Sequence, residues 1–230
     1  MPQRARSPTL RLRARGPLAC FTRPELKVER VSYPVMTPSS ARGLLEAVLW
    51  KPAIAWHAER ISVLKPIRFT AFRRNEVNSK AAVPAAAVVA NGGSVTPFFA
   101  DEDRAQRNTV ALRDVDYIVE AHFEMTDRAG PEDNMTKFVE IFERRVAKGQ
   151  HFHQPYFGCR EFVADILPAD GAPPPISDNR DLGIMLWDIA YSPDRNRPVF
   201  FAARLVEGVL EIPADPEATL ASAAAKGGAA

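Results

Sequence analysis

The clearest helical pattern of apolar residues begins after Thr37 and Pro38. A threonine hydroxyl can cap free backbone N–H groups, and proline at the first helical position loses no hydrogen bond. Pro52 ends the pattern, because proline cannot continue the helical hydrogen bonding. We therefore expect a helix between Thr37 and Pro52. Its apolar stripe consists of Ala41, Leu44, Leu45, Val48 and Leu49.

A second helix is predicted after Pro131, where acidic residues occupy the turn that suits the helix dipole. Gly149 is placed to terminate this helix. Apolar residues spaced at three, four and seven positions predict one face packed against other elements. The members of this stripe are Met135, Phe138, Val139, Phe142 and Val146.

Strict alternation of apolar and polar residues predicts strands with one buried face. It is clearest at 117–125, and it also occurs at 10–15 and 61–69. The aromatic-rich stretch 150–166 alternates in part, and we expect it to return to the sheet as a strand. Short strands are further predicted at 184–189, 199–205 and 209–212.

The order strand, helix, strand, loop, strand, helix, strand predicts an α+β, ferredoxin-like (split βαβ, RRM-like) domain with a small C-terminal β-rich annex. We expect this domain at 8–166, with a long loop or inserted hairpin at 81–108. Residues 167–213 then form the small β-rich C-terminal region. The tail at 214–230 has no large apolar residue apart from Leu220, so we predict a disordered tail there.

The composition restricts the class of protein. The 230 residues are 46% hydrophobic, which is enough to bury a sizeable core. No apolar run approaches the roughly 18 residues that cross a bilayer, and the basic N-terminus lacks the apolar region of a secretory signal. The two cysteines, Cys20 and Cys159, form no CxxC pair. These features predict a cytoplasmic protein without membrane contact, disulfide framework or structural zinc.

Basic residues are concentrated at 51–80, where seven Lys or Arg accompany two acidic residues in a chain of net charge +2. Arg68, Arg73 and Arg74 lie there beside Phe69 and Phe72. Guanidinium groups can hold phosphates and aromatic rings can stack on bases, so this mixture suits nucleic-acid binding. A charge run is equally compatible with an ordinary solvated surface, and the pattern alone leaves both interpretations open.

Among the four histidines, only His151 and His153 have a spacing that invites a metal. On a strand these two side chains share a face and could supply two ligands. No third ligand with matching spacing is evident, so we favour a structural or RNA-contacting role over zinc. The chain has no Walker loop, GxSxG or HExxH motif.

Three long blocks, at 20–80, 112–127 and 144–162, closely resemble the subtype I-C "Cas-five" proteins of CRISPR systems. The similarity covers roughly residues 10 to 210. It implies a ferredoxin-like protein that binds the repeat-derived 5′ handle of CRISPR RNA and cuts the precursor transcript. It also implies its partners: the repeat RNA, the backbone and large subunits of the type I-C interference complex, and target DNA indirectly.

The resemblance further implies a cleavage that needs no metal or other cofactor. The 2′-hydroxyl beside the scissile phosphate attacks in line, so the site must move protons and stabilise the phosphorane. Family members place a Tyr before the WKP motif and a Lys-His pair on the second helix. By alignment these positions are Leu49, Lys137 and Phe138, so only the lysine is retained. The other candidates for proton transfer are His151, His153 and Tyr33.

Retained processing is the favoured hypothesis, because an RNase that works by positioning and electrostatics can change its proton-transfer group more easily than its scaffold. The alternatives are a subunit that holds the handle without cutting it, and an unrelated metal-dependent nuclease. The residues expected to contact RNA are all basic: Arg23, Lys27, Arg42, Lys51, Arg68, Arg73, Arg74, Lys80 and Arg160.

Overall fold

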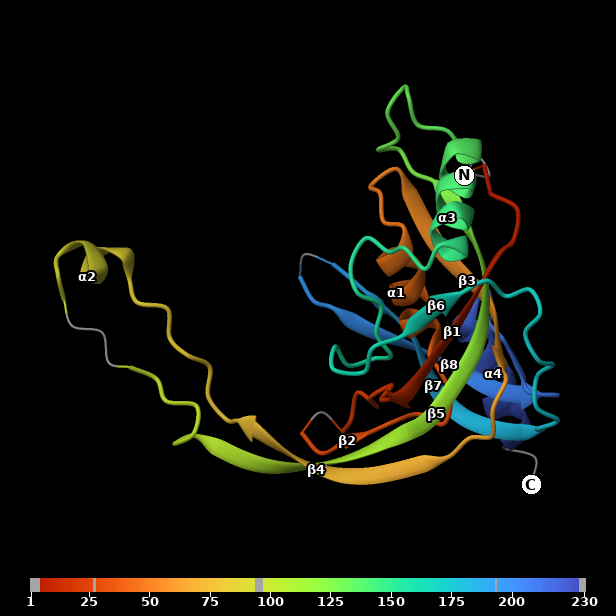
Figure 1. Cartoon of the computed structure of the whole chain (residues 1–230). Helices are drawn as coiled ribbons and strands as arrows, with labels where there is room; N and C mark the ends of the chain where they lie inside the picture. The colour runs from red at the N-terminus through yellow and green to blue at the C-terminus, as the bar shows by residue number, and fades with distance from the viewer. Residues whose placement is uncertain (1–4, 27, 94–96, 193, 228–230) are drawn as a thin grey trace.

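A curled, mainly antiparallel sheet forms the framework of the computed structural model, which describes residues 5–26, 28–93, 97–192 and 194–227 (Figure 1). The strands lie in the order β6-β1-β5-β3-β9-β8-β7, and β2 and β4 also pair with β5. The strands are β1 Leu10–Ala19, β2 Arg30–Val31, β3 Ile54–Val63, β4 Phe69–Val77, β5 Arg104–Met125, β6 Asp165–Leu167, β7 Arg180–Ala190, β8 Arg197–Val206 and β9 Val209–Glu211. The helices are α1 Pro38–Val48, α2 Ala86–Ala90, α3 Met135–Ala147 and α4 Pro216–Gly227.

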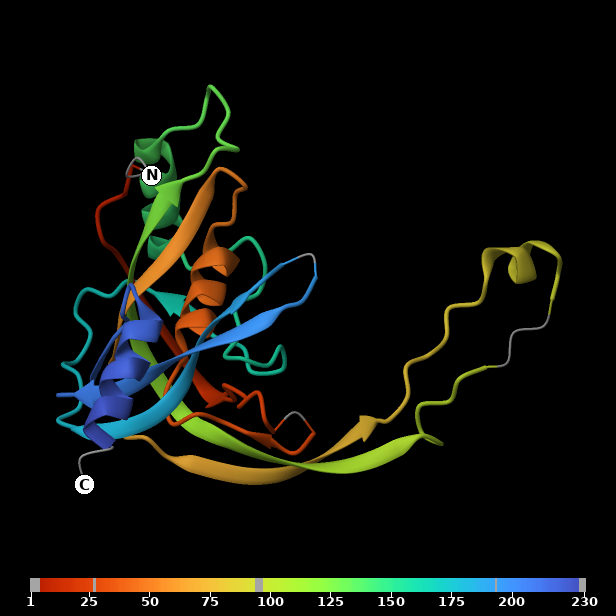
Figure 2. The ribbon, with the colours of Figure 1, turned by 180° about the vertical axis from the view of Figure 1, so that it is seen from behind.

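Strand β5 organises the sheet. Its second half lies between β1 and β3, so that Val119 is opposite both Leu12 and Ile61. Its first half pairs with β4 and leaves the body of the molecule as a long two-stranded extension (Figures 1 and 2). We call residues 69–77 and 104–112 the β4–β5 arm. One strand therefore belongs to both the core and the arm.

Helix α3 packs on the sheet through aromatic side chains, and both α1 and α3 pack through their apolar stripes. The ring of Trp56 in β3 lies 4.9 Å from that of Phe142 in α3, and Phe123 of β5 contacts Phe138 edge-on at 6.3 Å. These rings are buried, as are all five stripe residues of α1. The stripes predicted for both helices thus identify the faces that point into the core.

Both helices have a side-chain cap at the N-terminal end, and the acidic residues expected in the first turn of the second helix precede α3 instead. Thr37 precedes α1, and its hydroxyl accepts the Ser40 N–H at 3.3 Å. Asn134 precedes α3, and its side chain accepts the Lys137 N–H at 2.9 Å. These bonds satisfy N–H groups that have no partner inside the helix. None of the described helices is both long and apolar enough to span a membrane.

Two predicted strands are wrong in extent. The alternating stretch 61–69 is divided between the end of β3 and the start of β4, because Pro66 lies in it and cannot donate to a strand ladder. The stretch 150–166 is mostly loop, with only its end in β6. Gly158 turns the chain there with φ +78°, and Phe157 is buried as a loop residue rather than on a strand face.

Within the expected loop at 81–108, residues 104–108 belong to β5 and pair with β4, and residues 86–90 form the short helix α2. The expected disordered tail at 214–230 is instead helical over α4. The Asp215 carboxylate accepts the Ala218 N–H at 3.1 Å, and Thr219 Oγ1 accepts the Ala202 N–H of β8 at 3.2 Å. A capped, alanine-rich segment that contacts β8 has good reason to be helical.

The C-terminal β-rich region contains β7, β8 and β9, and it continues the main sheet. Strand β9 pairs with β3, where Glu211 lies opposite Arg60. The Arg60 guanidinium donates to the Glu211 carboxylate at 2.7 Å and to Glu120 at 3.1 Å. This pairing joins the C-terminal region to the core strands.

Candidate nucleic-acid interface

Leu49 and Phe138, at which the resemblance leads us to expect catalytic side chains, are core residues here. Their exposed fractions are 0% and 1%. Leu49 caps the C-terminal end of α1, and its carbonyl accepts the Trp56 indole N–H at 2.8 Å. Neither side chain is polar or reaches solvent, so neither can move a proton on bound RNA.

Lys137, in contrast to these buried residues, lies on the exposed first turn of α3. Its side chain is 46% exposed. The ammonium donates to the Glu132 carbonyl at 3.2 Å and lies 4.0 Å from the Asp133 carboxylate. A solvated ion pair of this kind is weak, so the ammonium is free to exchange these partners for a phosphate.

The C-terminal end of α1 is fastened to the segment that follows α3. The Ala47 carbonyl accepts the N–H groups of Phe152 at 2.7 Å and His153 at 3.2 Å. The Arg145 guanidinium donates to the Val48 carbonyl at 2.5 Å. Carbonyls at a helix end have no partner inside the helix, so these bonds fix the loop in place.

Exposed aromatic and basic side chains meet at this junction. The Trp50 and Phe152 rings are 47% and 61% exposed, with their centroids 6.4 Å apart and their planes 27° apart. The His153 ring lies edge-on to Phe152 at 5.8 Å. We call the five residues here the α1-end cluster: Trp50, Lys51, His151, Phe152 and His153.

The structure therefore places the segment of His151 and His153 beside the end of α1, next to which Lys51 lies, and leaves Lys137 apart from them. By helix rise, Lys137 lies about 12 Å along α3 from Arg145, which contacts the end of α1. Both histidines are exposed. Within the described residues, no group of three or more His, Cys, Asp or Glu side chains is arranged to hold a metal ion.

Tyr33 is 1% exposed and lies in the core. The guanidinium of Arg23, a predicted RNA contact, covers its ring at 4.5 Å from the centroid. Burial raises the pKa of the Tyr33 hydroxyl. This environment makes Tyr33 a poor base, because the charged form is disfavoured.

Arg42 is occupied by ion pairs inside the molecule. It binds the Asp188 carboxylate through two bonds of 2.8 and 2.9 Å, and it donates to Glu46 at 2.7 Å. Hydrogen bonding with Asp188 raises the pKa of the Arg42 guanidinium. Arg42 thus joins α1 to β7, and the RNA contact that the sequence predicts for it stays a prediction.

We expect Arg42→Ala and Asp188→Ala each to lower the free energy of unfolding by about 1.5–3 kcal/mol, the usual range for hydrogen bonds to charged groups. The double variant should cost clearly less than the sum, since both changes remove one bidentate interaction. Urea unfolding of the four proteins measures this. Additive losses would show that the two residues act independently.

The β4–β5 arm presents two different faces. Phe69 and Arg73 are exposed, whereas Phe72 and Arg74 on the alternate face are partly buried. Phe72 packs edge-on against Phe162 at 6.3 Å. Only the first face of the arm is open to a nucleic acid.

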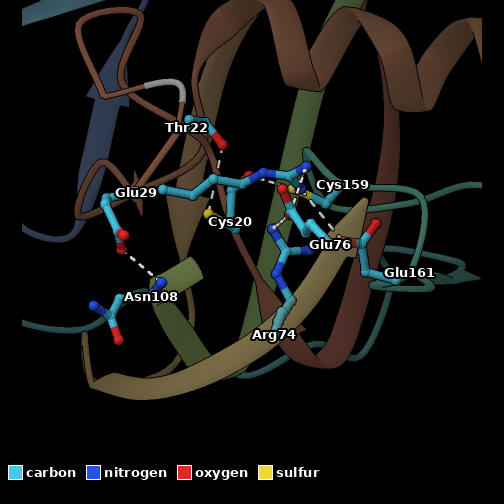
Figure 3. Close-up of polar contacts among 9 residues, drawn as sticks. Cys20, Thr22, Glu29, Arg74, Glu76, Asn108, Cys159 and Glu161 are labelled. Atoms are coloured by element: carbon cyan, nitrogen blue, oxygen red, sulfur yellow. Dashed lines mark hydrogen bonds and ion pairs between the residues drawn. The ribbon is translucent and has the colours of Figure 1, made fainter. Parts of the chain in front are cut away.

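Arg74 belongs to a partly exposed network that ties the arm to the loop after α3 (Figure 3). It donates to Glu76 at 2.7 Å and also to Glu161. Arg30 joins the same carboxylates at 3.3 and 3.4 Å and lies 3.3 Å from Cys159 Sγ. Arg74 therefore connects the arm to the body of the molecule, and its predicted contact with RNA stays a prediction.

Cys159 lies beside Cys20 at the base of this network (Figure 3). Its thiol donates to the Cys20 carbonyl at 3.7 Å. Hydrogen bonding with the Cys20 thiol, together with the charge of Arg30, lowers the pKa of Cys159 to about 6. Both cysteines are buried and unpaired by a disulfide.

The other residues predicted to contact RNA are either exposed or outside the described part of the structure. Lys27 lies outside the described residues. The exposed members of the set are Lys51, Arg68, Arg73, Lys80 and Arg160.

The sheet surface beside the outer edge of β3 is less suited to RNA. It contains a cavity of about 900 Å³, where His57 and His122 stack with ring centroids 5.2 Å apart. More carboxylates than guanidinium groups line this cavity, so its field disfavours phosphates. The charged residues are Glu59, Glu120, Glu124, Asp188, Glu211, Arg6, Arg42 and Arg60.

Sequence reasoning missed Trp50 and Phe152. Trp50 directly follows a helix end and precedes Lys51, and Phe152 lies between two histidines. An aromatic residue next to cations on both segments is the signal that was available. The segments are about a hundred residues apart in sequence, so only the fold shows that these rings meet.

Comparison with known proteins identifies the family to which this chain belongs. Residues 9–213 match the family model described as CRISPR-associated protein (Cas_Cas5). The chain is 48% identical over 213 residues to the CRISPR pre-crRNA endoribonuclease Cas5d of Mannheimia succiniciproducens, covering 89% of this chain and 94% of that protein. It is 43% identical over 224 residues to the protein of the same name from Thermus thermophilus, covering 90% and 92%.

Solved structures agree on the fold. One titled "Crystal Structure of CRISPR-associated Protein" matches with a TM-score of 0.67 and 21% sequence identity, covering 92% of this chain and 95% of that one. The chain therefore belongs to the Cas5 family of CRISPR-associated proteins, in its subtype I-C branch, Cas5d.

Proposed function

We propose that this protein is the type I-C subunit that binds the repeat-derived 5′ handle of crRNA and cleaves precursor crRNA. The observation that carries the proposal is the 48% identity, over 89% of the chain, to a relative named CRISPR pre-crRNA endoribonuclease. The exposed arginines of the β4–β5 arm and the α1-end cluster support it, because such side chains contact phosphates and bases.

The proposed RNA-binding core is of the ferredoxin-like, split βαβ type. In support, β1, α1, β3, β5, α3 and β6 follow one another along the chain, and the four strands are neighbours in the order β6-β1-β5-β3. Each neighbouring pair among them is antiparallel. Insertion of the β4–β5 arm between β3 and the core half of β5 is the main departure from this plan.

In the proposed reaction, the 2′-hydroxyl attacks the adjacent phosphate and the 5′-oxygen leaves, without a metal. Lys137 neutralises charge on the phosphorane, and the imidazoles of His151 and His153 accept and return the proton. These groups lie toward opposite ends of α3. A scissile phosphate that contacts both kinds of group must therefore lie between them.

The first experiment tests the reaction itself. We expect the purified protein to cut RNA of its own repeat in EDTA, leaving a 2′,3′-cyclic phosphate. A single 2′-deoxy nucleotide at the cut should abolish cleavage and leave binding intact, because it removes the nucleophile alone. Gel analysis of end-labelled RNA under protein excess measures both. Absence of cleavage would refute the enzymatic half of the proposal, and cleavage lost only in EDTA would refute its metal independence.

A second candidate function is a subunit that holds the handle without cutting it. The burial of Leu49 and Phe138 favours this candidate, because two positions that carry polar groups in resembling proteins are apolar here. Its signature is tight handle binding without cleavage, together with stable co-purification with other subunits.

The proposed partners follow from the same assignment. They are crRNA, the backbone and large subunits of the type I-C interference complex, and target DNA through that complex. The proposed location is the cytoplasm, where precursor transcripts are made. Co-expression with the other subunits, followed by purification through a tag on this chain, tests the protein partners.

A further inference from the structure

Trp50 and Phe152 differ from the other aromatic residues around α1 and α3. Trp56, Phe123, Phe138 and Phe142 are at most 4% exposed, whereas Trp50 is 47% and Phe152 is 61% exposed. Two large rings that face solvent leave apolar surface exposed, and the folding of the chain does not require this exposure. Because the two rings come from separate segments and still lie nearly parallel, they form one composite surface.

This surface is held in place by the backbone around it. The Leu49 N–H donates to the Leu45 carbonyl at 2.8 Å, and the Leu49 carbonyl accepts the Trp56 indole. On the other side, the N–H of Phe152 is bound to the Ala47 carbonyl at 2.7 Å. A ligand therefore meets rings whose backbones are already ordered, which lowers the entropy cost of binding.

The basic residues around the two rings indicate which kind of ligand the rings bind. Lys51, His151 and His153 border the rings, and Arg144 and Lys148 are exposed on the last turn of the neighbouring α3. Cations that border an open aromatic face suit a base and its adjoining phosphates, whereas an apolar peptide side chain would gain nothing from them. An unpaired base offers its face to such a site, and a base inside a duplex does not.

We propose that Trp50 and Phe152 form a stacking site for one unpaired nucleobase of the bound RNA, with phosphates on either side held by the cations of the α1-end cluster and α3. This inference rests on the proposed function, since it takes RNA as the ligand. It adds to that function a fixed point at which the strand must be single-stranded. The site recognises a base by stacking, so it tolerates any base.

The test compares RNA affinities of full-length variants by fluorescence anisotropy with labelled repeat RNA. Trp50→Ala should weaken binding about 5- to 100-fold, as expected for loss of one stacked base, and Phe152→Ala should weaken it less. Trp50→Phe should keep most of the affinity. Tyr191→Ala is the matched control, because it removes a 71% exposed ring from another part of the surface and should have no effect.

Two further measurements separate stacking from charge. The dependence of affinity on salt should be unchanged in Trp50→Ala, because no phosphate contact is lost. Repeat RNAs with one abasic ribose, scanned along the strand, should include one position at which wild type and Trp50→Ala bind equally. That position identifies the stacked base.

The possible results distinguish failure of the proposed function from failure of the stacking site alone. Wild-type protein that fails to bind repeat RNA overturns the proposed function and the stacking site with it. Normal RNA binding with undiminished affinity of both Trp50→Ala and Phe152→Ala overturns the stacking site alone, and so does a Trp50→Ala defect that persists equally at every abasic position. Unchanged circular dichroism of the variants shows that any loss is not caused by misfolding.

Discussion

Replacing Lys137 by alanine is expected to slow cleavage of precursor crRNA by roughly 10²–10³-fold, the usual cost of losing one group that stabilises charge in a transition state. Affinity for the RNA should remain nearly unchanged, because many other cations hold the phosphates. The ammonium is exposed and lightly paired with Glu132 and Asp133, so its removal should not disturb the fold. Single-turnover cleavage under protein excess separates the chemical step from binding.

Lys148→Ala is the matched control for this change. Lys148 caps the other end of α3, about 16 Å away by helix rise, and is also exposed. Its loss should weaken binding slightly and leave the single-turnover rate close to wild type. Equal rates for wild type and Lys137→Ala would remove Lys137 from the reaction. A larger defect in His151→Ala or His153→Ala than in Lys137→Ala would place the scissile phosphate at the α1-end cluster.

The surroundings of Phe138 do not suit the histidine that the resemblance leads us to expect at this position. Its ring packs edge-on against Phe123 and is 1% exposed. A histidine there would need a hydrogen-bond partner that the surrounding apolar side chains do not provide, and an unpaired buried polar group costs about 1–3 kcal/mol. The core at α3 has therefore adapted to an apolar residue, and any proton transfer must come from elsewhere.

The two helices that shape the site were predictable, because their apolar stripes are local and their caps are read from one or two residues. Thr37 and Asn134 each bind an N–H three residues ahead, which involves no distant part of the chain. The loop at 150–166 was not predictable in the same way. Its alternating aromatic residues suggest a strand, but Gly158 and the burial of Phe157 against β1 make it a loop.

The number of basic residues at the site was predictable from the sequence, but the partner that each of them binds was not. Arg42 and Arg74 belong to the basic surface suggested by the sequence, yet their partners Asp188 and Glu161 lie 146 and 87 positions away. No local pattern reveals such pairs. Arg73, one residue from Arg74, remains exposed because successive strand residues point to opposite faces. Side-chain direction on the arm thus decides which arginine can contact RNA.

Gly158→Ala is expected to be the most destabilising single methyl group that can be added near the site, lowering the free energy of unfolding by about 2–5 kcal/mol. Two effects add up. A residue with a side chain at φ +78° is strained by about 1–2 kcal/mol. The new Cβ would also overlap the Cys20 carbonyl oxygen and lie 2.8 Å from its carbon, which forces the backbone apart.

Gly171→Ala separates these two effects. Gly171 has φ +72°, but a Cβ there meets no atom within 4 Å, so only the strain of about 1–2 kcal/mol should appear. Urea unfolding of both variants measures the difference. Because the loop at Gly158 also carries Cys159 and Glu161, its displacement should loosen the arm and weaken RNA binding, whereas Gly171→Ala should bind normally. Equal stability losses in the two variants would show that the contact with Cys20 does not hold this loop.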